Sequence, residues 1–99
     1  MKFLPPEKVA ENAKKALEWK EKYNVKAGTR VGWIRANQLA NRKPVSLDIV
    51  KRIARFERHR KNAEYVGEPY KDKGKVMWEA WGGDEGIKWA KRVLEKFDE

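Results

Sequence analysis

The residues with the clearest chemical potential in this chain are cationic, and they are concentrated in its middle third. Residues 28–61 contain ten Lys or Arg against two acidic residues, a net charge of +8, whereas residues 1–27 carry +3 and residues 62–99 carry −2. Guanidinium groups match phosphate oxygens in geometry, and charge neutralisation supplies most non-specific affinity for nucleic acid. The candidate nucleic-acid-binding residues are Arg30, Arg35, Arg42, Lys43, Lys51, Arg52, Arg55, Arg58, Arg60 and Lys61.

Other interpretations of these cations stay open. The six Lys or Arg between positions 51 and 61 could simply solvate one helix face, or could meet an acidic protein surface. The stretch from Trp33 to Arg55 also faintly suggests a helix-turn-helix, but its link contains Pro44 and is not the tight turn of such motifs. The expected partner is therefore nucleic acid, with DNA favoured, or an acidic protein surface, in an undetermined oligomeric state.

Catalytic and metal chemistry find little support. The chain has no cysteine and one histidine, which excludes thiol nucleophiles, Cys-ligated zinc and multi-His metal sites. His59 could pair with Glu57 or Asp84 as acid and base, but no catalytic triad, phosphate loop or metal spacing accompanies it. We therefore expect a non-enzymatic protein that needs no metal or cofactor.

The tryptophans form a second distinctive group. They could stack on unpaired bases, but at helical spacing in so short a chain a packing role is favoured. The segment Gly82-Gly83 could form an anion nest, although Asp84 would compete for the same N–H groups. A sharp turn before a last helix capped by Asp84 is the preferred interpretation. The residues expected to be structural are Trp78, Trp81, Gly82, Gly83, Asp84 and Trp89.

Three strings in the chain are unusual. They are Trp81-Gly82-Gly83-Asp84-Glu85-Gly86 followed by Trp89-Ala90, then Arg55-Phe56-Glu57-Arg58-His59, and the segment from Val31 to Leu39. Together, from about Gly28 to Ala90, they resemble a small domain of unknown function that is common in phage genomes. The resemblance implies a viral or prophage origin, and in that family the module occurs alone or near head-morphogenesis proteins. The chain departs from the family pattern at Arg60-Lys61-Asn62.

Helical periodicity indicates the elements that position these residues. We expect one all-α domain over residues 1–99, with four main helices and a core within about 28–97. The expected helices cover about 6–23, 30–41, 47–62 and the residues after the cap at Asp84, with one or two helical turns over 75–81 and a long loop around 64–75. The first helix should pack on the rest of the domain.

Helix ends and faces can be predicted in more detail. Thr29 and Ser46 are the expected N-caps of the second and third helices. The second helix should turn Val31, Ile34 and Leu39 toward the core, and Gly32 inside it indicates a close contact with another helix. No apolar run approaches the roughly 20 residues that span a bilayer. The expectation is a soluble protein of the cytoplasm, of a host cell if the chain is viral.

Overall fold

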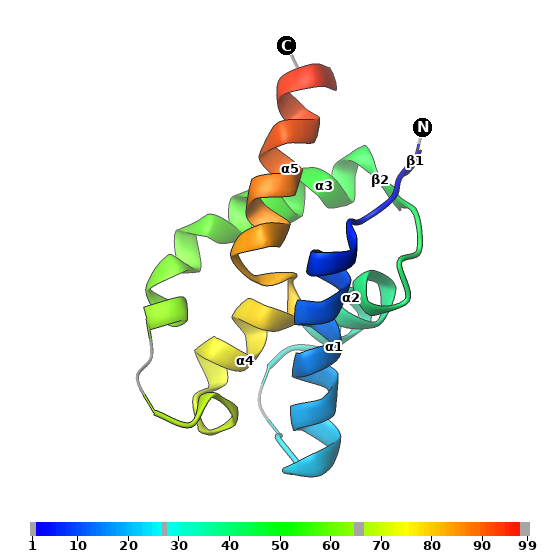
Figure 1. Ribbon diagram of the computed structural model, residues 1–99. Helices are drawn as coiled ribbons and strands as arrows, with labels where there is room; N and C mark the ends of the chain where they lie inside the picture. Colours follow the sequence, from blue (N-terminus) through cyan, green and yellow to red (C-terminus); the bar gives the residue numbers. More distant parts are fainter. Residues whose placement is uncertain (1, 27, 65–66, 98–99) are drawn as a thin grey trace.

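The computed structural model describes residues 2–26, 28–64 and 67–97, and it confirms the all-α fold class. Five α-helices account for most of the described chain (Figure 1). They are α1 (Glu7–Lys22), α2 (Arg30–Ala40), α3 (Leu47–Arg55), α4 (Lys73–Ala80) and α5 (Gly83–Phe97). The short elements are the strands β1 (Lys2–Phe3) and β2 (Val45–Ser46) and the 3-10 helices η1 (Phe56–Glu64) and η2 (Pro69–Lys71). No helix in these ranges is long and apolar enough to cross a membrane.

The helix starts follow from the expected capping chemistry. Thr29 accepts a hydrogen bond from the Gly32 amide at 3.0 Å, and Ser46 accepts one from the Ile49 amide at 3.3 Å. Each hydroxyl thus satisfies an amide that has no partner within its own helix. Both predicted N-caps are confirmed.

The helices pack around a small apolar core. Figure 1 shows α4 lying between α1 and η1, and α5 crossing α3, in agreement with the packing contacts between these elements. Fully or nearly fully buried residues from four helices meet there, among them Val9, Leu39, Ile53 and Trp89. Among the described residues, the most buried aromatic ring is Trp78 of α4, which is 1% exposed.

Two small contacts were not visible in the sequence. Lys2 pairs with Ser46 and Phe3 pairs with Val45, which makes a two-stranded antiparallel ladder of β1 and β2. Strands of two residues are too short to produce an alternating pattern. Tyr23 at the end of α1 stacks on Tyr70 of η2, with ring centroids 3.7 Å apart, and so places η2 beside α1.

The inner face of α2 differs from the predicted one. Val31 and Ile34 are 47% and 46% exposed, whereas Gly32, Arg35 and Leu39 are buried. The small residue at position 32 explains this choice, because a Cβ there would lie 2.6 Å from Sδ of Met77 on α4. The predicted close helix contact is confirmed, and the packing of α2 against both α1 and α4 determines which face of α2 turns inward.

The predicted helix over 47–62 is two elements. Regular α-helix stops at Arg55, and η1 continues with 3-10 winding that is kinked at His59. The predicted loop around 64–75 is also shorter than expected, since it contains η2 and α4 already begins at Lys73. Residues 65 and 66 of that loop lie outside the described residues.

Gly82 and Gly83 make the sharp turn that joins α4 to α5. Their φ angles are +100° and +66°, a region that costs L-residues free energy. A Cβ on Gly82 would lie 2.8 Å from Cγ1 of Val9 on α1. The buried amide of Asn12 donates to the Gly82 carbonyl at 2.8 Å and to Oε1 of Glu85 at 2.7 Å. The turn is therefore clamped against α1.

The expected cap at Asp84 is wrong in one respect. The last helix begins at Gly83, so Asp84 lies inside its first turn. Its carboxylate instead accepts a hydrogen bond from Nε1 of Trp78 at 3.2 Å. The Gly86 amide donates to the Gly82 carbonyl at 3.0 Å, so the helix begins at Gly83, two residues earlier than a cap at Asp84 would place it.

Replacing Gly82 with Ala should destabilise the fold. Backbone strain of this kind costs on the order of 1–3 kcal/mol, and the contacts with Val9 and Gly86 add to it. Gly74 is the matched control, because it lies in the first turn of α4 and is not among the positive-φ glycines. Gly74→Ala should leave stability unchanged or raise it by up to about 1 kcal/mol. Urea unfolding measures both, and equal free energies for the two variants would contradict the account of the turn.

Glu85 should make the fold sensitive to acid. The hydrogen bond from Asn12 lowers the pKa of Glu85 below 4.5, burial opposes this, and Lys8 and Lys88 lower it further. A lowered carboxyl pKa contributes stability that is present above the unfolded-state pKa and lost as pH falls through the folded-state pKa. The free energy of unfolding should therefore decrease as the pH is lowered below about 4.5.

Glu85→Gln should lose part of this acid dependence, because Gln keeps an acceptor for Asn12 and does not titrate. The check is urea unfolding from about pH 6 to about pH 3. Glu95→Gln, an exposed change on the same helix, should keep the full dependence. If Glu85→Gln also kept it, the Asn12 bond would not be the cause.

Candidate nucleic-acid interface

A cavity of about 600 Å³ lies where the start of α2, the junction of α3 with η1, and α4 meet. Four cationic side chains line it, three from α3 and η1 and one from α4: Arg52, Arg55, Arg58 and Lys73. Phe56, His59, Met77 and Trp81 supply its apolar and aromatic lining. Its volume falls within the range of small-molecule sites.

The cations around the cavity differ in their partners. Arg52 forms an ion pair with Asp48 at 3.2 Å, and both side chains are more than half exposed. In the described part of the chain, Arg55 and Lys73 have no carboxylate in ion-pair contact, and Nε of Arg58 donates to Nε2 of His59 at 3.2 Å. None of the described lining residues is acidic. The cavity therefore concentrates positive charge without an internal counter-charge.

The apolar side of the cavity is rigidly packed. Phe56 and Trp81 stack with ring centroids 4.9 Å apart and planes within 11°. Arg35 lies over the Trp81 ring, 5.2 Å from its centroid. Burial lowers the pKa of Arg35, the charge of Arg52 lowers it further, and Asp48 raises it. Arg35 was predicted to bind nucleic acid, but it is 5% exposed and lies outside the cavity lining, and its contact with Trp81 is structural.

Four side chains around the junction of α3 with η1 reach the same cavity. In a 3-10 helix, residues three apart eclipse. Phe56 and His59 are three apart in η1, His59 lies at its kink, and their ring centroids are 4.8 Å apart. Arg55, the last residue of α3, and Arg58 are also three apart, and all four side chains line the cavity.

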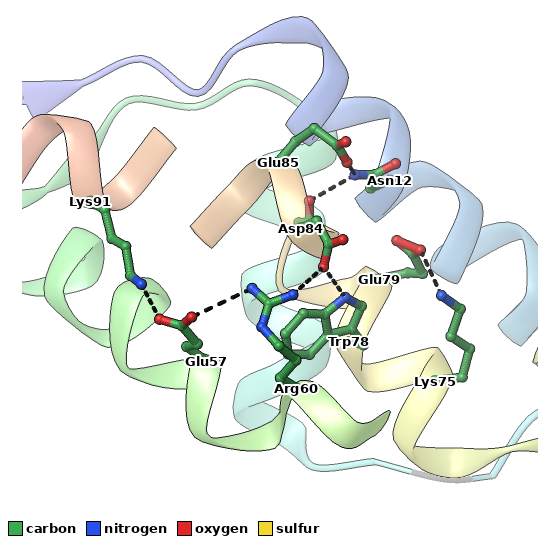
Figure 2. A network of polar contacts seen from close by, with 10 residues as sticks. Asn12, Glu57, Arg60, Lys75, Trp78, Glu79, Asp84, Glu85 and Lys91 are labelled. Atoms are coloured by element: carbon green, nitrogen blue, oxygen red, sulfur yellow. Dashed lines mark hydrogen bonds and ion pairs between the residues drawn. The ribbon is translucent and has the colours of Figure 1, made fainter. Parts of the chain in front are cut away.

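Arg60 belongs to a different group of contacts (Figure 2). It forms ion pairs with Asp84 at 3.3 Å and with Glu57 at 3.6 Å, and its guanidinium lies 5.4 Å from the Trp78 ring centroid. Lys91 pairs with the same Glu57, and this hydrogen bond is the main reason that the pKa of Glu57 is lowered. The contacts tie η1 to α5, so Arg60 has a structural role.

The structure brings three of the ten predicted cations to the cavity: Arg52, Arg55 and Arg58. Arg42 instead donates to the Pro5 carbonyl at 2.9 Å. Like Arg42, the other six predicted cations are not part of the lining: Arg30, Arg35, Lys43, Lys51, Arg60 and Lys61.

Sequence reasoning missed Lys73, Phe56 and Met77 as parts of this site. Lys73 fell within the expected loop around 64–75, and the position of α4 against η1 is a tertiary contact that leaves no local pattern.

The predicted structural residues lie in and around the α4–α5 turn. Trp78 and Trp89 are 1% and 7% exposed, Gly82 and Gly83 are buried, and Trp81 and Asp84 are partly exposed. Among the described residues, no group of three or more His, Cys, Asp or Glu could hold a metal ion.

Comparison of the chain with protein-family models, curated proteins and solved structures gives no match. The resemblance to the phage-type domain therefore stays a prediction, and the function has to be argued from the geometry of the site.

Two neighbouring arginines should respond differently to neutralisation. Arg60→Gln removes two ion pairs and the contact with Trp78, and it should lower the free energy of unfolding by about 0.5–1 kcal/mol, since these pairs are exposed. Arg58→Gln should change it by less than about 0.5 kcal/mol. Urea unfolding of both variants is the measurement. A larger loss of unfolding free energy for Arg58→Gln than for Arg60→Gln would contradict the structural role of Arg60.

Proposed function

We propose that this protein is a small non-enzymatic module that binds nucleic acid through the cationic cavity and the basic face of α3 and η1 beside it. One observation carries the proposal. Arg55, Arg58 and Lys73 come from three different elements, converge on one cavity, and face no acidic residue in its described lining. If these cations only solvated one helix face, there would be no reason for a lysine of α4 to line the same cavity as two arginines that precede it by 15 or more positions.

The physical basis is the focusing of charge in a concave site. Clefts lined with one sign of charge concentrate field lines, raising the local concentration of the opposite charge. Arg side chains can present a planar pair of donors to phosphate oxygens. The lining groups are suited to binding an anion and an aromatic ring. His59 has no acidic residue beside it in the described lining with which it could form an acid–base pair.

The resemblance seen in the sequence supports a phage or prophage origin within this proposal. The host cytoplasm is then the expected place of action, and DNA is the favoured nucleic acid. The basic net charge of +9 supports association with either DNA or RNA.

The test is charge reversal of the three lining cations that have no carboxylate in ion-pair contact among the described residues. Arg55→Glu, Arg58→Glu and Lys73→Glu together should lower affinity for nucleic acid by about 100-fold or more at low salt. They should also flatten the plot of log K against log salt, because each lost phosphate contact removes about 0.9 from the slope for duplex DNA. Arg52 is left in place because it already pairs with Asp48. Fluorescence anisotropy across a salt series measures both effects.

A charge-matched control separates the cavity from net charge. Lys14, Lys15 and Lys96 are exposed and lie on α1 and α5, away from the cavity. Their triple reversal to Glu changes the net charge equally and should cost much less affinity. Helical circular dichroism should be unchanged in both variants. Undiminished binding by the cavity variant, or equal losses in both, would contradict the proposal.

The alternative partner is an acidic protein surface, as in a virion-assembly module. The half-exposed Val31 and Ile34 on α2 favour it, because exposed apolar side chains beside charge are common at protein interfaces. The absorbance ratio at 260 and 280 nm after purification at low salt separates the two. Co-purified nucleic acid favours the first proposal, and a partner that stays bound after nuclease treatment favours the second.

A further inference from the structure

The cavity has two chemically unlike sides. Arg55, Arg58 and Lys73 offer charge, whereas Phe56, Met77 and Trp81 offer an apolar surface. Phosphate alone would need only the first side. An apolar surface next to a cluster of cations instead matches a ligand that carries a flat ring and an anion close together.

A nucleotide unit has this combination, but a base within a duplex does not present it. Paired bases are stacked on their neighbours, and a duplex offers phosphates and groove edges to a surface of this size. Unpaired bases are free to pack against aromatic and apolar side chains or Arg guanidinium planes. A duplex would contact the cations and leave the apolar side of the cavity empty.

The surroundings of the cavity also suit a sugar-phosphate unit. Thr29 already accepts a hydrogen bond from Gly32, which leaves its own O–H to donate to a phosphate or sugar oxygen. Gly74, in the first turn of α4, adds no side chain to the rim. Within the apolar side, Phe56 and Trp81 stack on each other, and Arg35, which does not line the cavity, contacts the Trp81 ring.

We infer that the cavity binds one unpaired nucleotide of a nucleic-acid strand, with the base against Phe56, Met77 and Trp81 and its phosphate at Arg55, Arg58 and Lys73. The inference rests on the proposed nucleic-acid binding and narrows it to single strands. Base packing of this kind is tolerant of sequence, so little base preference is expected.

The test measures binding of the full chain to two fluorescein-labelled oligonucleotides and competition by one free nucleotide. They are an oligo(dT) of about 15 nucleotides, the duplex of the same length and thymidine monophosphate. The single strand should bind at least about ten-fold more tightly than the duplex. Free thymidine monophosphate should compete only weakly, because it lacks the flanking phosphates.

Phe56→Leu removes the ring and keeps an apolar side chain. It should weaken single-strand binding about five- to ten-fold and leave duplex binding unchanged. Phe97→Leu is the matched control, since Phe97 is 49% exposed and contacts Phe3 rather than the cavity. This control should bind both probes like the natural chain.

A second measurement does not depend on the stability of any variant. An oligo(dT) carrying one 4-thiothymidine is photo-cross-linked to the natural chain, and the modified peptides are mapped by mass spectrometry. Cross-links should fall on peptides that contain Phe56, Met77 or Trp81. Cross-links confined to other peptides would overturn the inference.

The remaining outcomes are also decisive. Equal or tighter duplex binding, or equal losses on both probes in Phe56→Leu, overturns the inference while nucleic-acid binding stands. Thymidine monophosphate binding as tightly as the strand assigns the cavity to free nucleotides and also overturns it. Failure of all nucleic-acid probes to bind rejects the proposed function itself.

Discussion

The turn at Gly82 and Gly83 is the constraint on which the rest of the structure depends. Both residues adopt positive φ, and the turn packs so closely on α1 that a Cβ on Gly82 would collide with Val9. The buried amide of Asn12 holds the turn by donating to the Gly82 carbonyl and to Glu85. One side chain of α1 thereby fixes where α4 ends and where α5 begins.

The position of α4 then determines the cavity. Met77 on α4 and Trp81 directly after it lie against Gly32 of α2, and the same two side chains form part of the apolar lining. On the far side of the turn, Asp84 accepts from Trp78 and pairs with Arg60, which ties η1 to the start of α5 (Figure 2). The elements that carry Arg55, Arg58 and Lys73 are thus held together by contacts in which none of these three cations takes part.

The sequence allowed the fold class, the two capped helix starts and the Gly82-Gly83 turn to be predicted, because each depends on local chemistry. Gly32 was also correctly interpreted as a close contact, although the inward face of α2 was not predicted. Val31 and Ile34 are apolar, yet α4 approaches at Gly32 and leaves both of them exposed. Which face of α2 is buried depends on how other helices pack against it, and the periodicity of apolar residues within α2 carries no information about that packing.

The candidate site shows the same division. Arg52, Arg55 and Arg58 could be selected from the sequence because they lie in a basic segment, but the same criterion also selected seven cations that do not line the cavity. Lys73 and Phe56 could not, because their convergence depends on the change from α to 3-10 winding after Arg55 and on the placement of α4. Arg35 and Arg60 were selected by charge alone, but Arg35 packs on Trp81 and Arg60 pairs with Asp84, so both have structural roles.

The central claim is that the cavity between η1 and α4 is the place where the partner binds. The chain has two methionines, Met1 and Met77, and Met77 lines the cavity. An NMR titration of methyl-labelled methionine with unlabelled oligo(dT) therefore reads the cavity directly. The account predicts a saturable shift of the Met77 methyl signal with the same midpoint as binding. An oligonucleotide that binds while this signal stays unmoved would contradict it.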